Sequence, residues 1–226
     1  MKRYAIATLL FFSLAVGGYY LWLQRNHEPQ IPAAAETTAP SEEPSTDEVA
    51  AALVQEMAMG AEDAPITIVE YASFTCPHCA RYHNDVFGQI VANYVDTGKV
   101  RFVMRDVYFD RLGLWAAMLA RCDNGDRFFG VSDIVYETQH EWTSGETNLE
   151  IVQNLKKIGR LAGMDDAMMD ACLQDDAMAQ ALVATYQETT IRDEVNSTPT
   201  FMINGKQYPN MNYADFAEVL DGLLAE

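Results

Sequence analysis

The sequence predicts an α/β domain in which a small mixed β-sheet is interrupted by an all-helical insertion. A strand, a helix and a second strand follow one another over residues 66–107. Candidate helices then fill about residues 112–195, and two short strands and a final helix close the chain. Because 49% of the 226 residues are hydrophobic, the chain can build such a core without metals or many cross-links.

Residues 1–25 predict a membrane anchor or a signal segment. Residues 4–23 carry no formal charge, and as a helix at about 1.5 Å per residue they would span about 30 Å, the hydrocarbon thickness of a bilayer. Lys2 and Arg3 precede this run, and three aromatic residues near its far end are typical of a membrane interface. We expect an uncleaved anchor in the inner membrane, or else a cleaved signal peptide. Either interpretation places the rest of the chain outside the cytoplasm, in the periplasm or cell envelope if the anchor is kept, or secreted if the signal is cleaved.

Residues 26–59 predict an acidic tether, rich in Pro and Ala, that ends in a short helix. Four prolines lie in its first part without apolar periodicity, which is typical of an extended linker. Ser45 and Glu48 form a capping-box pattern before apolar residues at helical spacing, and Gly60 would end the helix. We expect this helix to dock on a domain that spans residues 60–226.

The formal net charge of −18 argues against one class of partner. An acidic surface repels nucleic acid and anionic lipid, so we expect no nucleic-acid partner. We interpret the net negative charge as a property that keeps the protein soluble.

The first βαβ unit follows from residue type and spacing. Residues 66–72 are mostly apolar and β-branched, as in a strand that is buried on both faces. Pro77 stands where the first residue of a helix would, and this helix runs to about Val95. Residues 100–107 alternate as the next strand, which should be parallel to the first because a helix joins them.

The insertion and the C-terminal hairpin follow from helix and turn signals. Asn204-Gly205 predicts a two-residue hairpin turn between strands at 200–203 and 206–208, and Asn212 caps a final amphipathic helix. Five candidate helices fill the insertion, and three Gly-containing breaks, at Gly125, Gly145 and Gly163, separate the first four. These helices are residues 114–122, 126–140, 148–162, 165–174 and 176–195.

Cys76 and Cys79 form a Cys-x-x-Cys pair at the predicted junction of strand and helix. Unpaired N–H groups and the helix dipole favour a thiolate at a helix N-terminus, the position of Cys76. His78 adds a donor or a positive charge near the same sulfur. A stabilised thiolate makes the disulfide a strong oxidant. Cys79, one turn into the helix, should be less exposed and would resolve a mixed disulfide by attacking Cys76.

Other uses of this cysteine pair are weaker. Covalent haem attachment requires a His where Ala80 stands. A zinc site would need two more ligands, and His83 is the nearest candidate, but no second pair completes the set. A purely structural disulfide would close too small a loop to add much stability. We expect no metal and no bound cofactor.

Cys122 and Cys172 both fall in the helical insertion and predict a structural disulfide. Exported chains with an even cysteine count usually pair their cysteines. Closing a loop of about 50 residues would stabilise the fold by roughly 4 kcal/mol in the chain-entropy model. Two buried free thiols or a second redox pair are the alternatives. Nearby methionines would suit Cu(I), but at helical spacing they are typical of core filling.

Two segments resemble a known family. The segment Ile-Val-Glu-Tyr-Ala-Ser-Phe-Thr-Cys-Pro-His-Cys at residues 68–79 resembles the active-site segment of the DsbA-like thiol–disulfide oxidoreductases. The segment Ser-Thr-Pro-Thr-Phe-Met-Ile-Asn-Gly at residues 197–205 is similar to the cis-proline segment of that family. The resemblance covers about residues 60–226 and implies a thioredoxin fold with a helical insertion.

The same resemblance implies roles for three further residues. Pro199 would have a cis peptide bond and face the cysteine pair, and Thr198 would offer backbone groups to an extended substrate chain. Glu70 corresponds to the buried acid of the family, which could relay the proton of Cys79. A salt-bridged core acid is the alternative interpretation of Glu70.

The family implies an enzyme that oxidises cysteines of exported proteins through Cys76 and Cys79. Its partners would be reduced or misoxidised exported proteins, together with a quinone-linked, DsbB-like membrane protein that reoxidises the pair. A disulfide isomerase or reductase of the same fold, and a non-enzymatic metal- or peptide-binding module, are the alternatives. Isomerases generally need an oligomer, whereas we expect a monomer.

Overall fold

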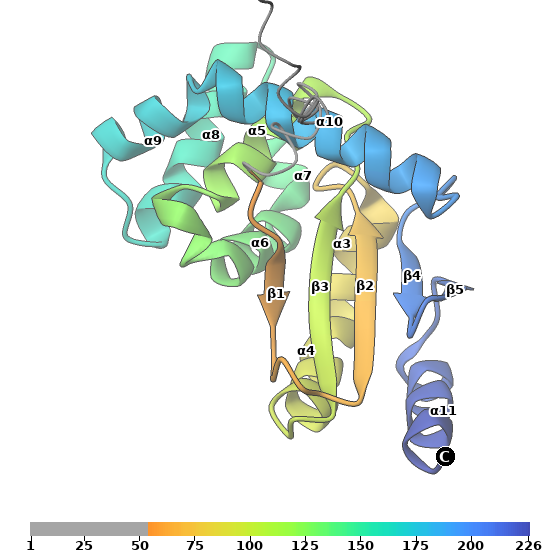
Figure 1. The fold of residues 1–226 in the computed structure, drawn as a ribbon. Coiled ribbons are helices and arrows are strands. Elements are labelled where there is room, and N and C mark those ends of the chain that lie inside the picture. Colours follow the sequence, from red (N-terminus) through yellow and green to blue (C-terminus); the bar gives the residue numbers. More distant parts are fainter. Residues whose placement is uncertain (1–53) are drawn as a thin grey trace, which may run out of the picture. The chain divides into compact units, whose positions relative to one another are not determined.

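A five-stranded mixed sheet organises residues 54–226, the part of the chain that the computed structural model describes (Figure 1). The strand order is β1-β3-β2-β4-β5. The strands are β1 (Met57–Met59), β2 (Ile66–Ala72), β3 (Val100–Asp106), β4 (Thr200–Ile203) and β5 (Lys206–Pro209). The expected anchor at residues 4–23 and most of the expected tether lie outside the described residues.

The central strands pair as the sequence predicts. β2 and β3 run parallel, with Glu70 opposite Met104, because a helix connects them. β4 lies antiparallel on the other side of β2, and β5 continues the hairpin. Asn204 and Gly205 both adopt positive φ at the turn between β4 and β5, the conformation that a two-residue hairpin loop needs.

The prediction of a short helix at the end of residues 26–59 is wrong for the part of that segment that the structure describes. Residues 57–59 form β1, which pairs antiparallel with β3 and places Met57 opposite Met104. This pairing satisfies the backbone of β3 and buries Met57, a long-range gain that a local helical spacing cannot show. Gly60 does not end a helix; it has a φ of 92°, and a Cβ there would lie 2.4 Å from the carbonyl oxygen of Val100. The sheet therefore begins before residue 60.

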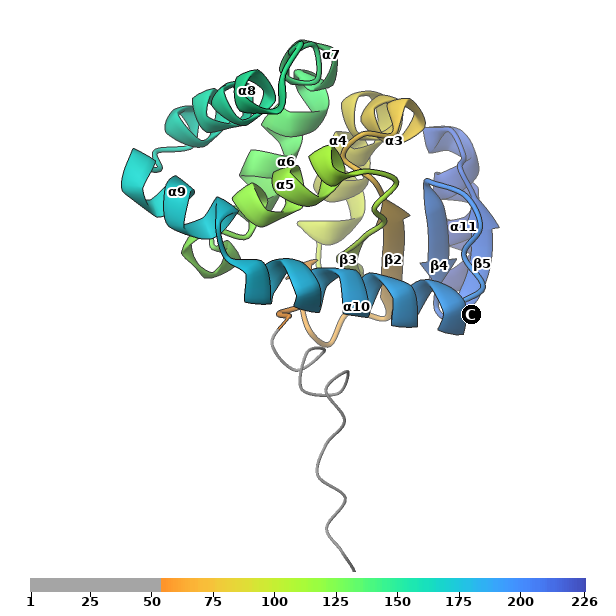
Figure 2. The ribbon, with the colours of Figure 1, turned by 90° about the horizontal axis from the view of Figure 1, so that it is seen from above.

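The helix that follows β2 is continuous but changes its winding. It runs as α3 (Pro77–Tyr82), a π-helical turn (His83–Phe87), α4 (Gly88–Ile90) and a second π-helical turn (Val91–Val95). Figure 2 shows α3 and α4 on one face of the sheet and α10 on the other. β2 is therefore covered on both faces, as its mostly apolar, β-branched sequence predicts.

The helical insertion is confirmed. Its elements are α5 (Arg111–Ala120), a 3₁₀ turn (Asp123–Gly125), α6 (Phe128–Glu137), α7 (Gln139–Trp142), α8 (Asn148–Leu161), α9 (Asp166–Leu173) and α10 (Asp176–Arg192). Thr147 and Glu150 form a capping box at the start of α8, and Asn212 caps α11 (Tyr213–Leu224). Within residues 54–226 no helix combines the length and the hydrophobicity that crossing a membrane requires.

The hydrophobic core is shared by the sheet, the helix after β2 and the insertion. Phe74, just after β2, packs on Tyr136 of α6 with ring centroids 5.0 Å apart. Tyr82 of α3 packs on Phe201 of β4 at 4.7 Å. The insertion therefore rests directly against the end of the strand that leads to the cysteine pair.

Candidate redox site

Cys76 and Cys79 lie where the chain turns from β2 into α3. Cys76 is the N-cap residue, with an extended backbone, and Pro77 starts the helix, where its missing N–H costs nothing. Both cysteines are free thiols in the structure. Cys76 is 6% exposed and Cys79 is 0% exposed, so only Cys76 offers its sulfur to a partner chain.

The surroundings of Cys76 stabilise its thiolate. A hydrogen bond from the Cys79 thiol contributes most, and the backbone N–H groups of Cys79 and His78 add to it. Although burial opposes ionisation, these donors lower the pKa of Cys76 to about 5. At neutral pH the Cys76 sulfur is therefore ionised, which makes it a good leaving group in thiol–disulfide exchange.

Cys79 has the opposite preference. Burial raises the pKa of Cys79 well above its ordinary value, and the hydrogen bond with Cys76 and the charge of Glu70 raise it further. The reduced pair therefore holds one proton at neutral pH, and that proton lies on Cys79. Any reaction that breaks or forms the Cys76–Cys79 bond must deliver this proton to Cys79 or remove it.

His78 approaches Cys76 through its backbone rather than through its ring. The side chain is exposed, and Arg81 lies 2.6 Å from its Nδ1. Because a guanidinium can only donate, Nδ1 must accept this hydrogen bond. The donor that the sequence led us to expect near the Cys76 sulfur is thus the His78 N–H, with the imidazole placed beside Arg81.

The loop before β4 faces the cysteine pair. The Thr198–Pro199 peptide bond is cis, and the Cys76 Sγ lies 3.6 Å from the carbonyl oxygen of Thr198, to which the thiol can donate. Pro199 is buried and Thr198 is half-buried. The structure thus brings together the two segments, 122 residues apart, that carry the family resemblance.

Glu70 is buried in β2 and pairs with a histidine of the helix after it. Its Oε2 lies 2.9 Å from Nε2 of His83. Glu70 Oε1 and His83 Nδ1 have no hydrogen-bond partner among the described residues. The His83 ring stacks on Tyr136 with centroids 4.1 Å apart. Glu70 is therefore both a buried acid whose charge reaches Cys79 and a partner in a buried hydrogen bond with His83.

Two side chains that the sequence did not reveal fasten the turn before Cys76 to the insertion. Gln139 Nε2 donates to the carbonyl oxygens of Phe74 at 2.8 Å and Cys76 at 3.1 Å. Thr75 Oγ1 donates to Asp110 Oδ2 at 2.9 Å, and Asp110 also caps the N-terminus of α5. No local pattern could reveal Gln139, because its partners lie more than 60 residues away.

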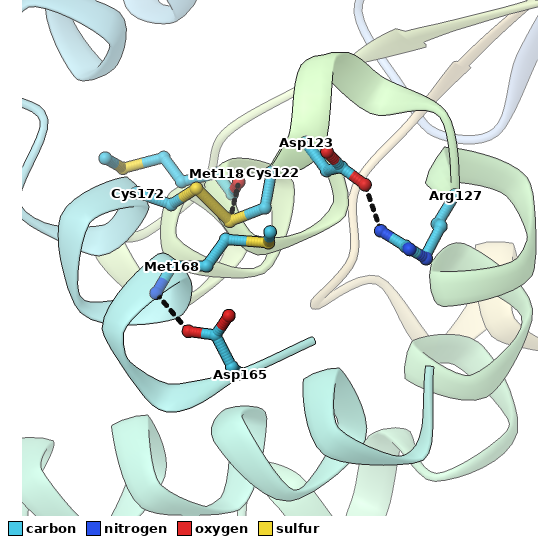
Figure 3. Close-up of a disulfide and its surroundings, with 7 residues drawn as sticks. All are labelled: Met118, Cys122, Asp123, Arg127, Asp165, Met168 and Cys172. Carbon is cyan, nitrogen blue, oxygen red and sulfur yellow. Dashed lines mark hydrogen bonds and ion pairs between the residues drawn. A yellow bond between two sulfur atoms is a disulfide. The ribbon is translucent and has the colours of Figure 1, made fainter. Parts of the chain in front are cut away.

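The second pair of cysteines forms the disulfide that the sequence predicts (Figure 3). Cys122 and Cys172 have Cα atoms 5.8 Å apart and are separated by 50 residues. The bond joins the turn just after α5 to α9, and Asp165, at the start of α9, caps that helix by accepting from the Met168 N–H. It fastens two helices of the insertion to each other.

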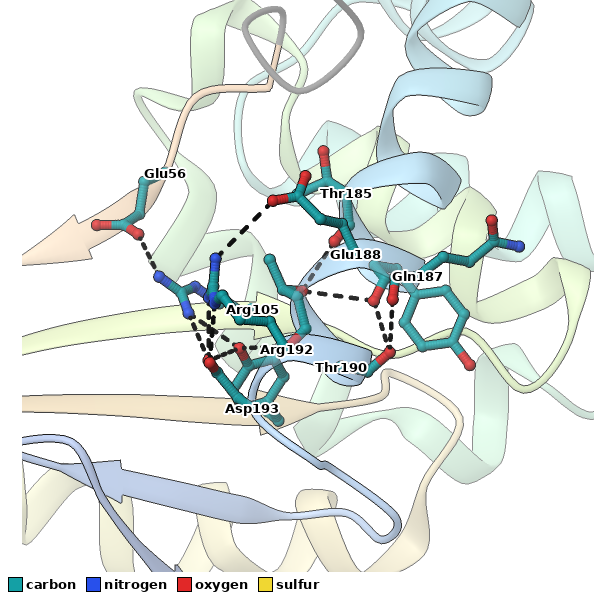
Figure 4. A network of polar contacts seen from close by, with 11 residues as sticks. Glu56, Arg105, Thr185, Gln187, Glu188, Thr190, Arg192 and Asp193 are labelled. Atoms are coloured by element: carbon teal, nitrogen blue, oxygen red, sulfur yellow. Dashed lines mark hydrogen bonds and ion pairs between the residues drawn. The ribbon is translucent and has the colours of Figure 1, made fainter. Parts of the chain in front are cut away.

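A polar network fastens the end of α10 to the sheet (Figure 4). Arg105 of β3 donates to the Tyr71 hydroxyl at 2.9 Å, to Asp193 at 3.1 Å and to Glu56 at 3.0 Å. Tyr71 of β2 also donates to Asp193. Because Asp193 lies shortly before the cis-proline loop, the network fixes the point from which that loop leaves the insertion.

Comparisons with known proteins point to one family. A thioredoxin family model matches residues 52–222. A Rickettsia bellii protein with the provisional name protein-disulfide oxidoreductase is 34% identical over 173 residues. The match covers 76% of this chain and 65% of that protein, so the chain spans slightly less than two thirds of its relative.

Two solved structures extend the comparison. Wolbachia pipientis alpha-DsbA1 has a TM-score of 0.70 and 27% identity, over 76% of this chain and 92% of that one. A protein-disulfide isomerase from Novosphingobium aromaticivorans has a TM-score of 0.66 and 25% identity, over 74% of this chain and 97% of that one.

Proposed function

The chain belongs to the thioredoxin family, as one of its DsbA-like members, and from this premise we propose that it oxidises cysteine pairs of exported proteins to disulfides. One observation carries the direction of the proposal. The donors around Cys76 lower the pKa of its thiol to about 5, and a stable thiolate favours the reduced pair over its disulfide. The Cys76–Cys79 disulfide is then a strong oxidant.

The exchange proceeds in two displacements. A substrate thiolate attacks the Cys76 sulfur, the Cys76–Cys79 bond breaks, and the Cys79 sulfur leaves and takes up a proton. A second substrate thiolate then attacks the substrate sulfur of the mixed disulfide and expels Cys76 as a thiolate. Two electrons pass from the substrate to the enzyme pair, and the substrate leaves with a new disulfide.

The remaining site residues have supporting roles in this proposal. The segment at Thr198 and Pro199 offers its backbone beside Cys76, where an extended substrate chain would lie. His78 stabilises the Cys76 thiolate through its N–H, and Glu70 exchanges the proton of Cys79.

The setting of the reaction belongs to the same proposal. The substrates are reduced or misoxidised proteins of the periplasm, and residues 4–23 hold the enzyme at the inner membrane. Turnover requires an oxidant that accepts two electrons from the reduced pair, and a quinone-linked, DsbB-like membrane protein has that chemistry. The enzyme works as a monomer.

Disulfide isomerisation is the second candidate, because a solved relative carries that name. An isomerase attacks wrong disulfides from its reduced form and needs no net oxidant. The two candidates therefore differ in which redox form of the pair is active.

A redox titration of the Cys76–Cys79 pair in glutathione buffers tests the direction. We expect a potential well above that of thioredoxin, about −270 mV, and nearer to about −120 mV. The oxidised protein should also form disulfides in a reduced substrate protein, and Cys76→Ser should abolish that activity. A potential near the thioredoxin value, or refolding of a scrambled substrate by the reduced form alone, would overturn the oxidase proposal.

A further inference from the structure

His83 has no part in the displacements above, yet it is the hydrogen-bond partner of the acid that raises the pKa of Cys79. Both side chains are buried: His83 is 2% exposed and Glu70 is 0% exposed. The pair is joined through Glu70 Oε2 and His83 Nε2, so within residues 54–226 the other polar side-chain atom of each residue has no partner. Burying polar atoms without partners is costly, so these two atoms call for an explanation, and a catalytic role is one that such atoms can have.

His83 also borders the surface. It lines a groove of about 590 Å³ between the helix after β2 and α6. The same groove is lined by Asp133 and Glu137, two exposed carboxylates of α6. Glu70 does not line this groove, so His83 stands between the buried acid and the solvent.

We propose that His83 is a positioning residue that carries the proton of Cys79 between Glu70 and the groove. The inference rests on the proposed function, because it concerns the same Cys76–Cys79 chemistry. When a substrate opens the disulfide, His83 takes a proton from the groove and passes it to Glu70, which delivers it to the Cys79 thiolate and is ionised again once the pair is reduced. When the pair is reoxidised, the Cys79 thiol gives its proton to Glu70 and the same path returns it to solvent. One proton moves each way, and no electron passes through His83.

Imidazole suits this position. Its two nitrogens allow it to accept a proton on one side and release one on the other near neutral pH. The groups that face the ring are Glu70 of β2, Tyr136, Asp133 and Glu137 of α6, and Tyr82 of the same helix. Of these, only Glu70 hydrogen-bonds to the ring among the described residues.

The attack of Cys79 on a mixed disulfide tests the proposal directly. The mixed disulfide of Cys76 with glutathione is trapped in acid, the pH is raised, and glutathione release is followed between pH 5 and 10. His83→Gln keeps a donor for Glu70 but cannot shuttle a proton. We expect this variant to slow release at least about tenfold at pH 6–7, since general acid–base groups contribute about 10²-fold or more. The loss should fade at high pH, where hydroxide removes the Cys79 proton.

A matched control uses the exposed histidine of α7. His140→Gln should release glutathione at the rate of the unaltered protein at every pH. Release rates of His83→Gln that equal those of the unaltered protein overturn the proposal. A loss that is the same at all pH values also overturns it, because it would mark a structural role.

A second variant covers the case in which His83→Gln does not fold. Glu70→Gln removes the acid and keeps the ring, and should produce the same pH-dependent loss. Where both single variants fold, the double variant should release glutathione no more slowly than the slower of the two single variants, because both residues lie on one proton path. Additive losses overturn the shared path. Failure of the oxidase proposal is distinguishable, since it would appear in the unaltered protein as a low redox potential and inactivity toward reduced substrates.

Discussion

Gln139 of α7 donates a hydrogen bond to the carbonyl oxygen of Cys76 at 3.1 Å, across 63 residues of sequence. The same amide donates to Phe74 at 2.8 Å, so one side chain of the insertion holds both ends of the turn that presents the reactive thiol. The insertion is therefore part of the apparatus that shapes the redox site.

Gln139→Ala should loosen this turn. Two buried or half-buried carbonyl oxygens lose their donor, which should lower the free energy of unfolding by about 1–3 kcal/mol. Urea denaturation of the oxidised protein measures the loss. Gln153→Ala, on an exposed position of α8, is the matched control and should change stability by less than about 0.5 kcal/mol. Equal effects of the two substitutions would contradict this role of Gln139.

The pKa of Cys76 predicts a pH-dependent stability of the reduced protein. An unfolded cysteine ionises near pH 8.5, whereas the pKa of Cys76 in the fold is about 5. Between these values the unfolded chain binds more protons than the folded chain, so stability rises with pH and is lost as pH falls toward 5. Each pH unit in this window should add up to about 1.4 kcal/mol. Cys79, with its raised pKa, affects stability only above the unfolded value.

Denaturation of the reduced and oxidised proteins between pH 5 and 8 checks this expectation. The oxidised protein has no thiol at Cys76 and should lack the trend, as should the reduced Cys76→Ser variant. The rate of Cys76 alkylation should be half-maximal near pH 5. Alkylation that becomes appreciable only above pH 8 would show that the thiolate is not stabilised.

The Cys122–Cys172 disulfide should contribute stability without tuning the redox pair. Its loop of 50 residues predicts a loss of about 4 kcal/mol when both cysteines are changed to Ala. Urea denaturation of the double variant measures this loss, and the Cys76–Cys79 potential should stay unchanged. A shift of that potential in the double variant would instead assign the second disulfide a redox role.

Tyr71→Phe should weaken the contact between α10 and the sheet. The change removes a buried hydroxyl that bonds to Asp193 and Arg105, and should lower the free energy of unfolding by about 1–2 kcal/mol. Tyr208→Phe, in the short edge strand β5, is the matched control and should have a smaller effect. The two variants can be compared by urea denaturation at pH 7. An equal loss of unfolding free energy in both would contradict a stabilising role of the Tyr71 hydroxyl.

The pH dependence of the Tyr71→Phe effect follows from Asp193. Hydrogen bonds, first from Arg192 and then from Tyr71, lower the pKa of Asp193. Its contribution to stability is therefore present above the pKa of an unfolded carboxyl, about 3.9, and is lost as pH falls below it. The difference in the free energy of unfolding between Tyr71→Phe and the unaltered protein should therefore become smaller below about pH 3.9.

The sequence predicts most of this fold because its signals are local or strongly periodic. The apolar, β-branched run of β2, the Asn204-Gly205 turn and the Asn212 cap of α11 each determine their own element, and the structure contains them where expected. β1 was not predictable in this way. Its three residues become a strand only because β3 offers them a free edge, and that edge lies more than 40 residues further along the chain.

The residues of the site also differ in whether a local sequence signal marks them. Cys76, Cys79 and Pro199 are marked by motifs, whereas Gln139 carries no signal of its own. His83 is an intermediate case. It lies four residues after Cys79, and side chains at this spacing share one face of a helix. The sequence suggested His83 only as a weak candidate zinc ligand. Its contact with Glu70 could not be predicted, because that contact depends on how the helix packs against the sheet.

The strand β1 has a consequence for anyone who shortens this chain. A version that begins at Pro65 would remove β1 and leave β3 with a row of unpaired N–H and C=O groups along one side. An uncovered strand edge of this kind can recruit strands from other molecules, so the trimmed domain should precipitate or associate even though both cysteine pairs are intact. Three residues, Met57–Met59, thus protect the protein from self-association.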